Sequence, residues 1–140
     1  MPTLNDYMRS VYRDGGRGEV VRGRRQFDCW GMSIAIRHEL LGLPLLPAWS
    51  FVRAMDKRHL TRAWSDQRSA LEQCEPEVGA LAAVYRSDLC LHIAVVVEID
   101  GGLAVVETRP QGPRWMRLRA FEQQYTRVRY YRDRDLSQQA

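Results

Sequence analysis

The hydrophobic pattern of the chain changes near residue 78. Before it, apolar residues recur at a spacing of three or four, as Leu4, Tyr7, Met8 and Val11 do, which is typical of helices with one buried face. After it, short apolar runs are separated by turn residues, which is typical of β-strands. Helices followed by an antiparallel meander predict an α+β fold, with N-terminal helices packed on a small antiparallel sheet rather than a doubly wound sheet.

Capping signals set the bounds of the first two helices. Thr3 with Asp6 at the third helical position forms a capping box, and Asp28 is a good N-cap for a second helix that Gly42 ends. The elements predicted in this half are a helix over 3–13, a flexible, basic, glycine-rich loop up to residue 26, a largely buried helix over 29–41, an extended connection at 44–47 and one or two polar helices within 51–73.

In the second half, Asp100-Gly101-Gly102 predicts a hairpin turn, because such turns require positive φ angles that these residues accept. The polar tail, 133–140, is expected to fray. The other predicted elements are strands over 80–85, 92–99, 103–108, 114–118 and 128–131, and a short helix over 118–125.

Length and composition fit one domain. The 140 residues are 45% hydrophobic, which is enough to bury a core, so residues 1–140 are treated as a single domain. The net charge is +4, but the arginines are scattered from Arg9 to Arg134, which indicates a solvated surface of mixed charge. The sequence lacks the motifs of RNA-binding and zinc-finger domains, and we expect no nucleic-acid partner.

We expect neither a membrane span nor a secretory signal. No run approaches 18 apolar residues, and the N-terminal segment lacks the apolar core of a signal peptide. A protein of this kind that works outside the cytoplasm would be carried there by other means.

Three cysteines, Cys29, Cys74 and Cys90, are too few and too irregularly spaced for a disulfide framework or a cysteine-rich zinc site. This usage indicates folding in a reducing compartment. Cys29 differs from the others because it follows Asp28, at the start of a helix, where unpaired N–H groups and the helix dipole favour the nucleophilic thiolate. The alternative is a small buried apolar residue, as most free cysteines are.

His92 is the candidate base for this nucleophile. It opens an apolar strand where a polar residue is unexpected, although a structural role is the alternative. His38, nine residues after Cys29 on the same helix, is expected to point away, and His59 lies in a polar stretch and is expected to be solvated. Cys90 is expected on the His92 face of the strand, as a rival nucleophile without a helix N-terminus.

The predicted hairpin offers a third partner. With a two-residue loop, Glu107 falls opposite Ala94 or Val96, and either register places it on the His92 face, whereas a three-residue loop would turn it away. Glu107 could then accept a hydrogen bond from the imidazole, as the third member of a catalytic triad does. The alternative is a carboxylate at the rim that pairs with Arg109.

Several segments together resemble the NlpC/P60 family of papain-like cysteine peptidases: FDCWG at a helix start, EPEVGALAAVY, and LHIAVVVEIDGGLAVVET. The DCWG form, LGLPL and LRAFEQQYTRVRYYR resemble the subgroup encoded in phage and prophage tail modules, the tail assembly protein K-like proteins. The resemblance covers about residues 20–132. It implies a papain-like fold in which Cys29 attacks an amide, His92 acts as base and Glu107 orients it, while Asp28 and Trp30 contact substrate. The third residue is usually His, Asn or Gln in that family, and a carboxylate there would hold His92 protonated more strongly.

The resemblance also implies a function. Family members cleave amide bonds in the stem peptides of peptidoglycan, typically between a γ-D-glutamyl group and a diamino acid, without a metal or an organic cofactor. A member of the tail subgroup would be made in the host cytoplasm, bind other tail-tip or baseplate proteins, and act from the virion tail on the cell wall. The alternatives are a catalytically silent structural tail component with the same fold, and a host enzyme that recycles wall fragments or cleaves another amide.

Overall fold

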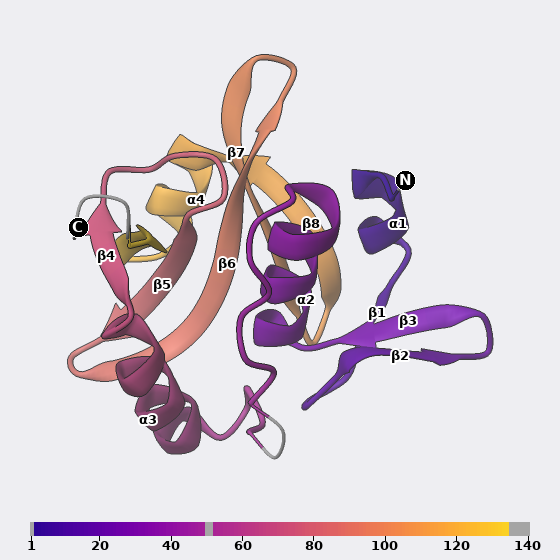
Figure 1. Cartoon of the computed structure of the whole chain (residues 1–140), viewed down its shortest axis with the longest axis horizontal. Coiled ribbons are helices and arrows are strands. Elements are labelled where there is room, and N and C mark those ends of the chain that lie inside the picture. The colour runs from indigo at the N-terminus through magenta and orange to yellow at the C-terminus, as the bar shows by residue number, and fades with distance from the viewer. Residues whose placement is uncertain (1, 50–51, 135–140) are drawn as a thin grey trace.

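The computed structural model describes residues 2–49 and 52–134, which form an α+β fold with four α-helices, a three-stranded mixed sheet and a six-stranded antiparallel sheet (Figure 1). The helices are α1 (Leu4–Met8), α2 (Cys29–Ala35) with its π-helical continuation η1 (Ile36–Leu40), α3 (Lys57–Arg68) and α4 (Leu118–Gln124). The strands are β1 (Val11–Tyr12), β2 (Arg17–Val21), β3 (Arg24–Phe27), β4 (Leu71–Cys74), β5 (Leu81–Arg86), β6 (Leu89–Ile99), β7 (Gly102–Arg109), β8 (Gly112–Arg117) and β9 (Val128–Asp133).

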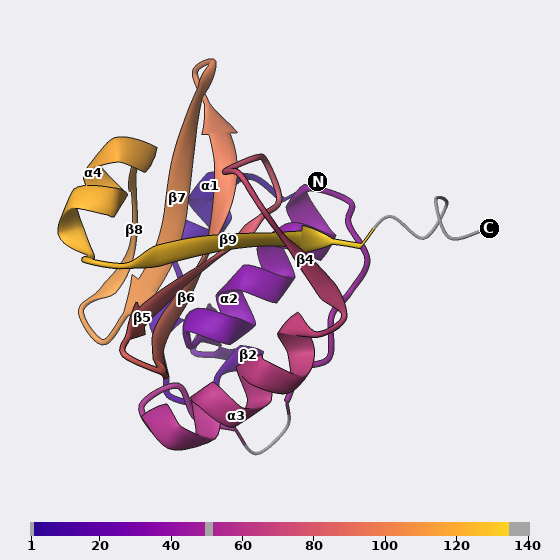
Figure 2. The same ribbon diagram turned by 90° about the vertical axis from the view of Figure 1, so that its left-hand side faces the viewer.

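The centre of the larger sheet is buried on both faces, because β5, β6 and β7 carry near-continuous apolar runs. Met32 and Ile36 of the α2 region pack on Val95 and Val106 on one face, while Phe121 of α4 packs with others on the opposite face. Figure 2 shows α4 on one side of the sheet and α2 and α3 on the other. The expectation of an α+β fold with helices packed on an antiparallel sheet is confirmed at this level.

The strand order departs from a simple meander. The order is β4-β9-β5-β6-β7-β8, so the last strand returns between β4 and β5, with Tyr131 opposite both Gln73 and Leu81. The predicted polar helix is confirmed at Lys57–Arg68, but helix was wrong for 71–73, which belong to β4. This segment is a strand because it pairs with β9, about sixty residues away in the sequence. The local spacing of apolar residues does not predict such a distant pairing. Phe51, where the prediction began, lies outside the described residues.

The expectation of a flexible loop at 15–26 was wrong. Strands β2 and β3 pair there as a hairpin that extends away from the larger sheet (Figure 1). Its turn, Arg22-Gly23, has φ angles of 52° and 77°, so glycine supplies a specific turn geometry rather than mobility. The first helix ends at Met8, and Val11–Tyr12 form β1, because this segment pairs in parallel with β3.

The other turns and ends agree more closely with the sequence. Ile99 pairs with Gly102 around a two-residue Asp100-Gly101 turn, as one of the two predicted registers requires. The frayed tail was wrong at residue 133: Asp133 belongs to β9 and pairs with buried Arg37 at 2.6 Å between Oδ2 and Nη2. Residues 135–140 lie outside the described part of the chain.

The start of α2 packs tightly against the chain that precedes β2. Asp28 caps the helix as expected, with Oδ1 accepting from the Gly31 N–H at 2.9 Å. A Cβ added at Gly31 would stand 2.1 Å from the carbonyl oxygen of Gly16. Only glycine therefore lets the helix lie against the chain before β2.

Gly31→Ala is expected to lower the free energy of unfolding by about 1–3 kcal/mol, because the methyl group overpacks a backbone contact. Helix propensity alone would give the opposite sign, since alanine is favoured over glycine in helices. Chemical denaturation measures the change. Gly102→Ala is the control, because its Cβ meets the end of the long Arg117 side chain at 3.1 Å and no backbone atom closer than the Ile99 carbonyl oxygen at 3.9 Å. Equal stability losses in the two variants would contradict this account.

Candidate active site

Cys29 is the first residue of α2 and is 2% exposed. A pocket of about 210 Å³ reaches it, and His92 of β6 lines the same pocket. The helix start and the strand, 63 positions apart in the sequence, are thus brought together at one cavity. The other residues that line it are Tyr12, Ala54, Met55, Lys57, Val84, Leu91, Thr108, Arg109, Pro110 and Tyr125.

His92 and Glu107 form a buried pair. The imidazole Nε2 lies 2.7 Å from Glu107 Oε1, with 12% and 0% of the two side chains exposed. Val95 opposite Val106 shows the register expected for the Asp100-Gly101 turn, in which Glu107 lies on the His92 face. The predicted proximity is confirmed. Glu107 is buried rather than at the rim, and its ion pair with Arg109, 4.0 Å between Nε and Oε2, is longer than its 2.7 Å contact with His92.

Two further donors hold the Glu107 carboxylate. The Tyr125 hydroxyl donates to Oε1 at 2.7 Å, and Arg114 Nε donates to Oε2 at 2.6 Å. Tyr125 comes from the turn after α4 and Arg114 from β8. Both were missed from the sequence, although Arg114 falls opposite Glu107 in the strand register, so a correct placement of the Pro110-Gln111 turn would have found it.

These contacts set the charge of the pair. Burial raises the pKa of Glu107, but hydrogen bonds from His92, Tyr125 and Arg114 outweigh it and lower the pKa to about 2. Burial lowers the pKa of His92, but hydrogen bonding to Cys29 and Glu107 and their negative charge outweigh it and raise the pKa to about 9. At neutral pH the carboxylate is therefore ionised and the imidazole protonated. Since Nε2 faces Glu107, Nδ1 is the ring nitrogen left for Cys29.

Asp28 lies at the site but not in the pocket. Its side chain is fully buried, and its oxygens accept from Gly31 N, from Gly15 N at 3.0 Å and from Arg17 Nη1 at 2.7 Å. Among the described residues it is not one that lines the cavity. The family resemblance implies that Asp28 contacts substrate. Here the carboxylate is not exposed, because it accepts hydrogen bonds from the helix start and pairs with Arg17.

Arg17 was missed from the sequence. Besides the Asp28 contact, its Nη2 donates to the Val52 carbonyl at 3.0 Å, so one side chain joins β2, the start of α2 and the segment before α3. Nothing in the local sequence distinguishes it from the neighbouring arginines, because the contact depends on the hairpin that β2 forms.

Trp30 is a core residue rather than a surface for substrate. It is fully buried, stacks on Trp49 at 3.7 Å between ring centroids, and donates from Nε1 to the Pro47 carbonyl at 2.9 Å. An edge-on contact with Trp64 links it to α3. The substrate contact implied by the resemblance is again absent among the described lining residues, since the indole anchors the connection between α2 and α3.

Cys90 was expected on the His92 face of the strand, and this expectation was wrong. The β5–β6 register shifts between Val84, opposite His92, and Tyr85, opposite Cys90, and this bulge turns Cys90 into the core beside Cys29 and Ile93. Burial, with a smaller effect from Cys29, raises the pKa of Cys90 to about 12. A thiol held protonated in this way is a poor rival nucleophile.

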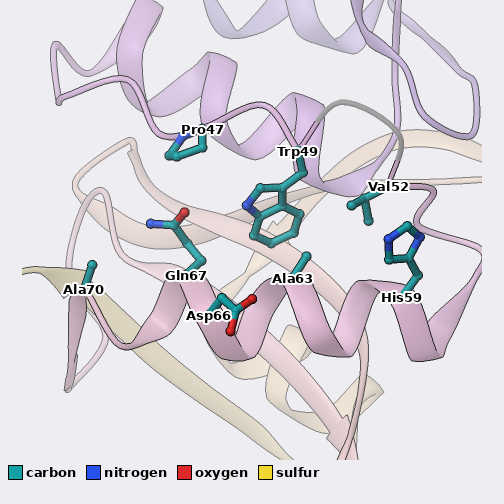
Figure 3. A pocket seen from close by; sticks show the side chains of 8 residues that line it. All are labelled: Pro47, Trp49, Val52, His59, Ala63, Asp66, Gln67 and Ala70. Carbon is teal, nitrogen blue, oxygen red and sulfur yellow. The ribbon is translucent and has the colours of Figure 1, made fainter.

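A larger pocket, of about 620 Å³, lies between α3 on one side and Pro47, Trp49 and Val52 on the other (Figure 3). Figure 3 shows the Trp49 indole reaching toward α3 above Ala63, with His59 at one end. His59 is thus half-buried, not fully solvated as expected. None of the cysteines in the described part of the chain lines this pocket, so its size does not make it the candidate active site. His38 is exposed and points away from Cys29, as predicted.

The chain matches no family model, and neither a curated protein nor a solved structure matches it. Over residues 2–49 and 52–134, no group of three or more His, Cys, Asp and Glu side chains is arranged to hold a metal ion. In the same part of the chain, no helix is long and apolar enough to cross a membrane.

Glu107→Gln is expected to lower the pKa of His92 from about 9 toward its ordinary value of 6.5, because the neutral amide no longer stabilises the imidazolium. NMR titration of the imidazole protons measures this shift. Tyr125→Phe is the matched control, since it removes one hydrogen bond from Glu107 but keeps the negative charge. A His92 pKa that is the same in Glu107→Gln and in the unchanged protein would contradict the pairing.

The same pair predicts a pH dependence of stability. The folded pKa of Glu107 is below its ordinary 4.5, so its contribution is present above pH 4.5 and is lost as pH falls toward 2. The folded pKa of His92 is above 6.5, so its contribution is complete below 6.5 and is lost as pH rises through 9. Denaturation should therefore show the largest stability difference between the unchanged protein and Glu107→Gln, about 1.5–3 kcal/mol, near pH 5–6. A pH-independent difference would contradict it.

Proposed function

We propose that this protein is a thiol hydrolase with a papain-like, NlpC/P60-type fold that cleaves amide bonds in peptidoglycan stem peptides. The observation that carries the proposal is the assembly of Cys29, at a helix N-terminus, with an imidazolium that Glu107 holds in place at one pocket. A nucleophile, a base and an orienting carboxylate are the parts that covalent acyl transfer requires.

The first half of the mechanism uses the charges found at neutral pH. Protonated His92 beside Cys29 favours the thiolate, whose sulfur forms a bond to the substrate carbonyl carbon. Backbone N–H groups in the first turn of α2, which have no partner within the helix, stabilise the oxyanion. His92 then donates its proton to the nitrogen of the leaving amine, the C–N bond breaks, and a thioester to Cys29 remains.

The second half returns the enzyme to its starting state. Neutral His92 takes a proton from water, and the hydroxide formed attacks the thioester carbon. The C–S bond breaks, the product leaves with a new carboxyl group, and the thiolate–imidazolium pair forms again. Glu107 stays ionised throughout and fixes the orientation of the ring.

The sequence motifs support a proposal for where this reaction takes place. Because they resemble phage and prophage tail proteins, we propose that the protein acts from the virion tail on the cell wall, with other tail-tip or baseplate proteins as partners. The substrate bond in this proposal joins a γ-D-glutamyl group to a diamino acid.

A catalytically silent tail component is the second candidate. Two observations favour it: Cys29 is only 2% exposed, and the pocket of about 210 Å³ is smaller than the roughly 300 Å³ at which ligand sites usually begin. In that interpretation the His92–Glu107 pair stabilises the fold and takes no part in catalysis.

Alkylation with iodoacetamide between pH 4 and 9, read for each cysteine by mass spectrometry, separates the two candidates. The hydrolase requires Cys29 to react well below pH 8.5, the ordinary pKa of a free thiol, and His92→Ala to remove that reactivity. Cys74, whose pKa burial raises, provides the internal comparison. If Cys29 is inert, or follows the pH profile of Cys74, the silent component is the correct interpretation.

Cleavage of a γ-D-glutamyl-diamino acid peptide tests the activity directly. Cys29→Ala is expected to reduce kcat by roughly 10⁴-fold or more, since the covalent route is lost, and Glu107→Gln by about 10²-fold, since proton transfer depends on the oriented ring. Cys90→Ala is the control thiol variant and should stay within a few-fold. Retained cleavage in Cys29→Ala would contradict the mechanism.

A further inference from the structure

Two neighbouring residues on the wall of the Cys29 pocket carry polar groups that the mechanism does not use. Thr108 is 1% exposed, and its Oγ1 is buried without a hydrogen-bond partner within the described chain; the same holds for Nε of Arg109. Only one other buried side-chain atom in that part of the chain, Nη1 of Arg37, is in this state. Buried polar groups are normally paired, so two unpaired donors on residues that line one pocket point to a ligand.

The charge of Arg109 is also without a close counterpart. The nearest carboxylate, Glu107, lies 4.0 Å from its Nε and already accepts shorter bonds from His92, Tyr125 and Arg114. The remaining contact of its guanidinium is a 3.2 Å hydrogen bond from Nη1 to the neutral Gln111 side chain. A planar guanidinium with free donors is well suited to a carboxylate.

Lys57 supplies a second cation to the same pocket. Its Nζ donates to the Ala54 carbonyl at 2.7 Å, and no carboxylate of the described residues forms an ion pair with it. It is also the first residue of α3, where the helix dipole disfavours a cation. Among the described residues that line the pocket, Lys57, Arg109 and protonated His92 are cationic, and none is Asp or Glu, so the cavity favours an anion.

We propose that Thr108, Arg109 and Lys57 form a carboxylate-binding subsite beside Cys29, which selects amide substrates that carry a free carboxylate next to the scissile bond. This inference rests on the proposed hydrolase and deepens it. In a γ-D-glutamyl amide the α-carboxylate is such a group, and its amidated form replaces the charge with a neutral carboxamide. A site built of buried donors rejects an analogue that leaves those donors unpaired.

Two alkylating agents of nearly equal size test the subsite without requiring turnover. Iodoacetate carries a carboxylate and iodoacetamide a neutral amide, and both transfer their carbon to the Cys29 sulfur with loss of iodide. The ratio of their rates at Cys29, read by mass spectrometry, should be at least tenfold higher in the folded protein than at the same cysteine unfolded in urea. Dividing by the iodoacetamide rate removes any change in thiolate population.

Variants assign the effect to residues. Arg109→Gln and Lys57→Gln should each lower the ratio several-fold, and Thr108→Val should lower it by a smaller factor. Arg119→Gln is the matched control, because it removes an exposed arginine on α4 that is not one of the described residues lining the pocket, and should leave the ratio unchanged. An unchanged ratio in both Arg109→Gln and Lys57→Gln, a folded ratio equal to the unfolded one, or a Cys29 inert to both reagents would overturn the subsite.

A pair of peptides separates this inference from the proposed function. The two contain the same γ-D-glutamyl-diamino acid bond, one with a free α-carboxylate and one with an α-carboxamide. Cleavage of the first at least tenfold faster supports both proposals, whereas equal cleavage overturns the subsite and keeps the hydrolase. A raised iodoacetate ratio without cleavage of either peptide supports the subsite and counts against the hydrolase.

Discussion

The buried carboxylate of Asp28 is the constraint on which the rest of the site depends. It caps α2, holds the chain before β2 through Gly15, and pairs with Arg17, all without exposure to solvent. A buried charge is tolerated only when it is fully paired, so the helix start, the hairpin and the segment before α3 must assume one arrangement together. Cys29 follows Asp28 directly, so that arrangement fixes its backbone, while its side chain packs in the core cluster that includes Cys90 and Ile93.

A second buried carboxylate organises the other half of the site. Glu107 gathers His92, Tyr125 and Arg114 from three separate elements, and their hydrogen bonds together outweigh the cost of burying the charge. The two carboxylates differ in their partners: Asp28 accepts mainly from backbone and one arginine, which fixes geometry, whereas Glu107 accepts from a titratable ring, which also fixes its charge. Asp28 therefore fixes the backbone position of Cys29, whereas Glu107 fixes the orientation and the protonation state of His92.

Local sequence rules predicted the parts of the site that depend on interactions between residues close together in the sequence. One turn of helix is enough to predict the N-cap at Asp28 and the helix start at Cys29. One hairpin turn is enough to predict the strand register that brings Glu107 to His92. The rest depends on distant pairing. The insertion of β9 beside β4 and the Arg17 contact arise only once the fold closes, and the bulge that hides Cys90 leaves the alternation of apolar residues unchanged. Motif resemblance could not tell that Trp30 is buried, because a motif records which residue occurs and not which way it faces.

A carboxylate in the third position has a chemical consequence for acyl transfer. Cys29 and Glu107 together raise the pKa of His92 to about 9, so the imidazolium stays populated over a wide pH range. The same stabilisation makes the imidazolium a weaker acid toward the leaving amine, since proton transfer is most efficient when the pKa lies near the working pH. A neutral residue at position 107 would make the imidazolium a stronger acid, but it would also remove the ionised acceptor that orients the ring, so it would not by itself speed proton transfer.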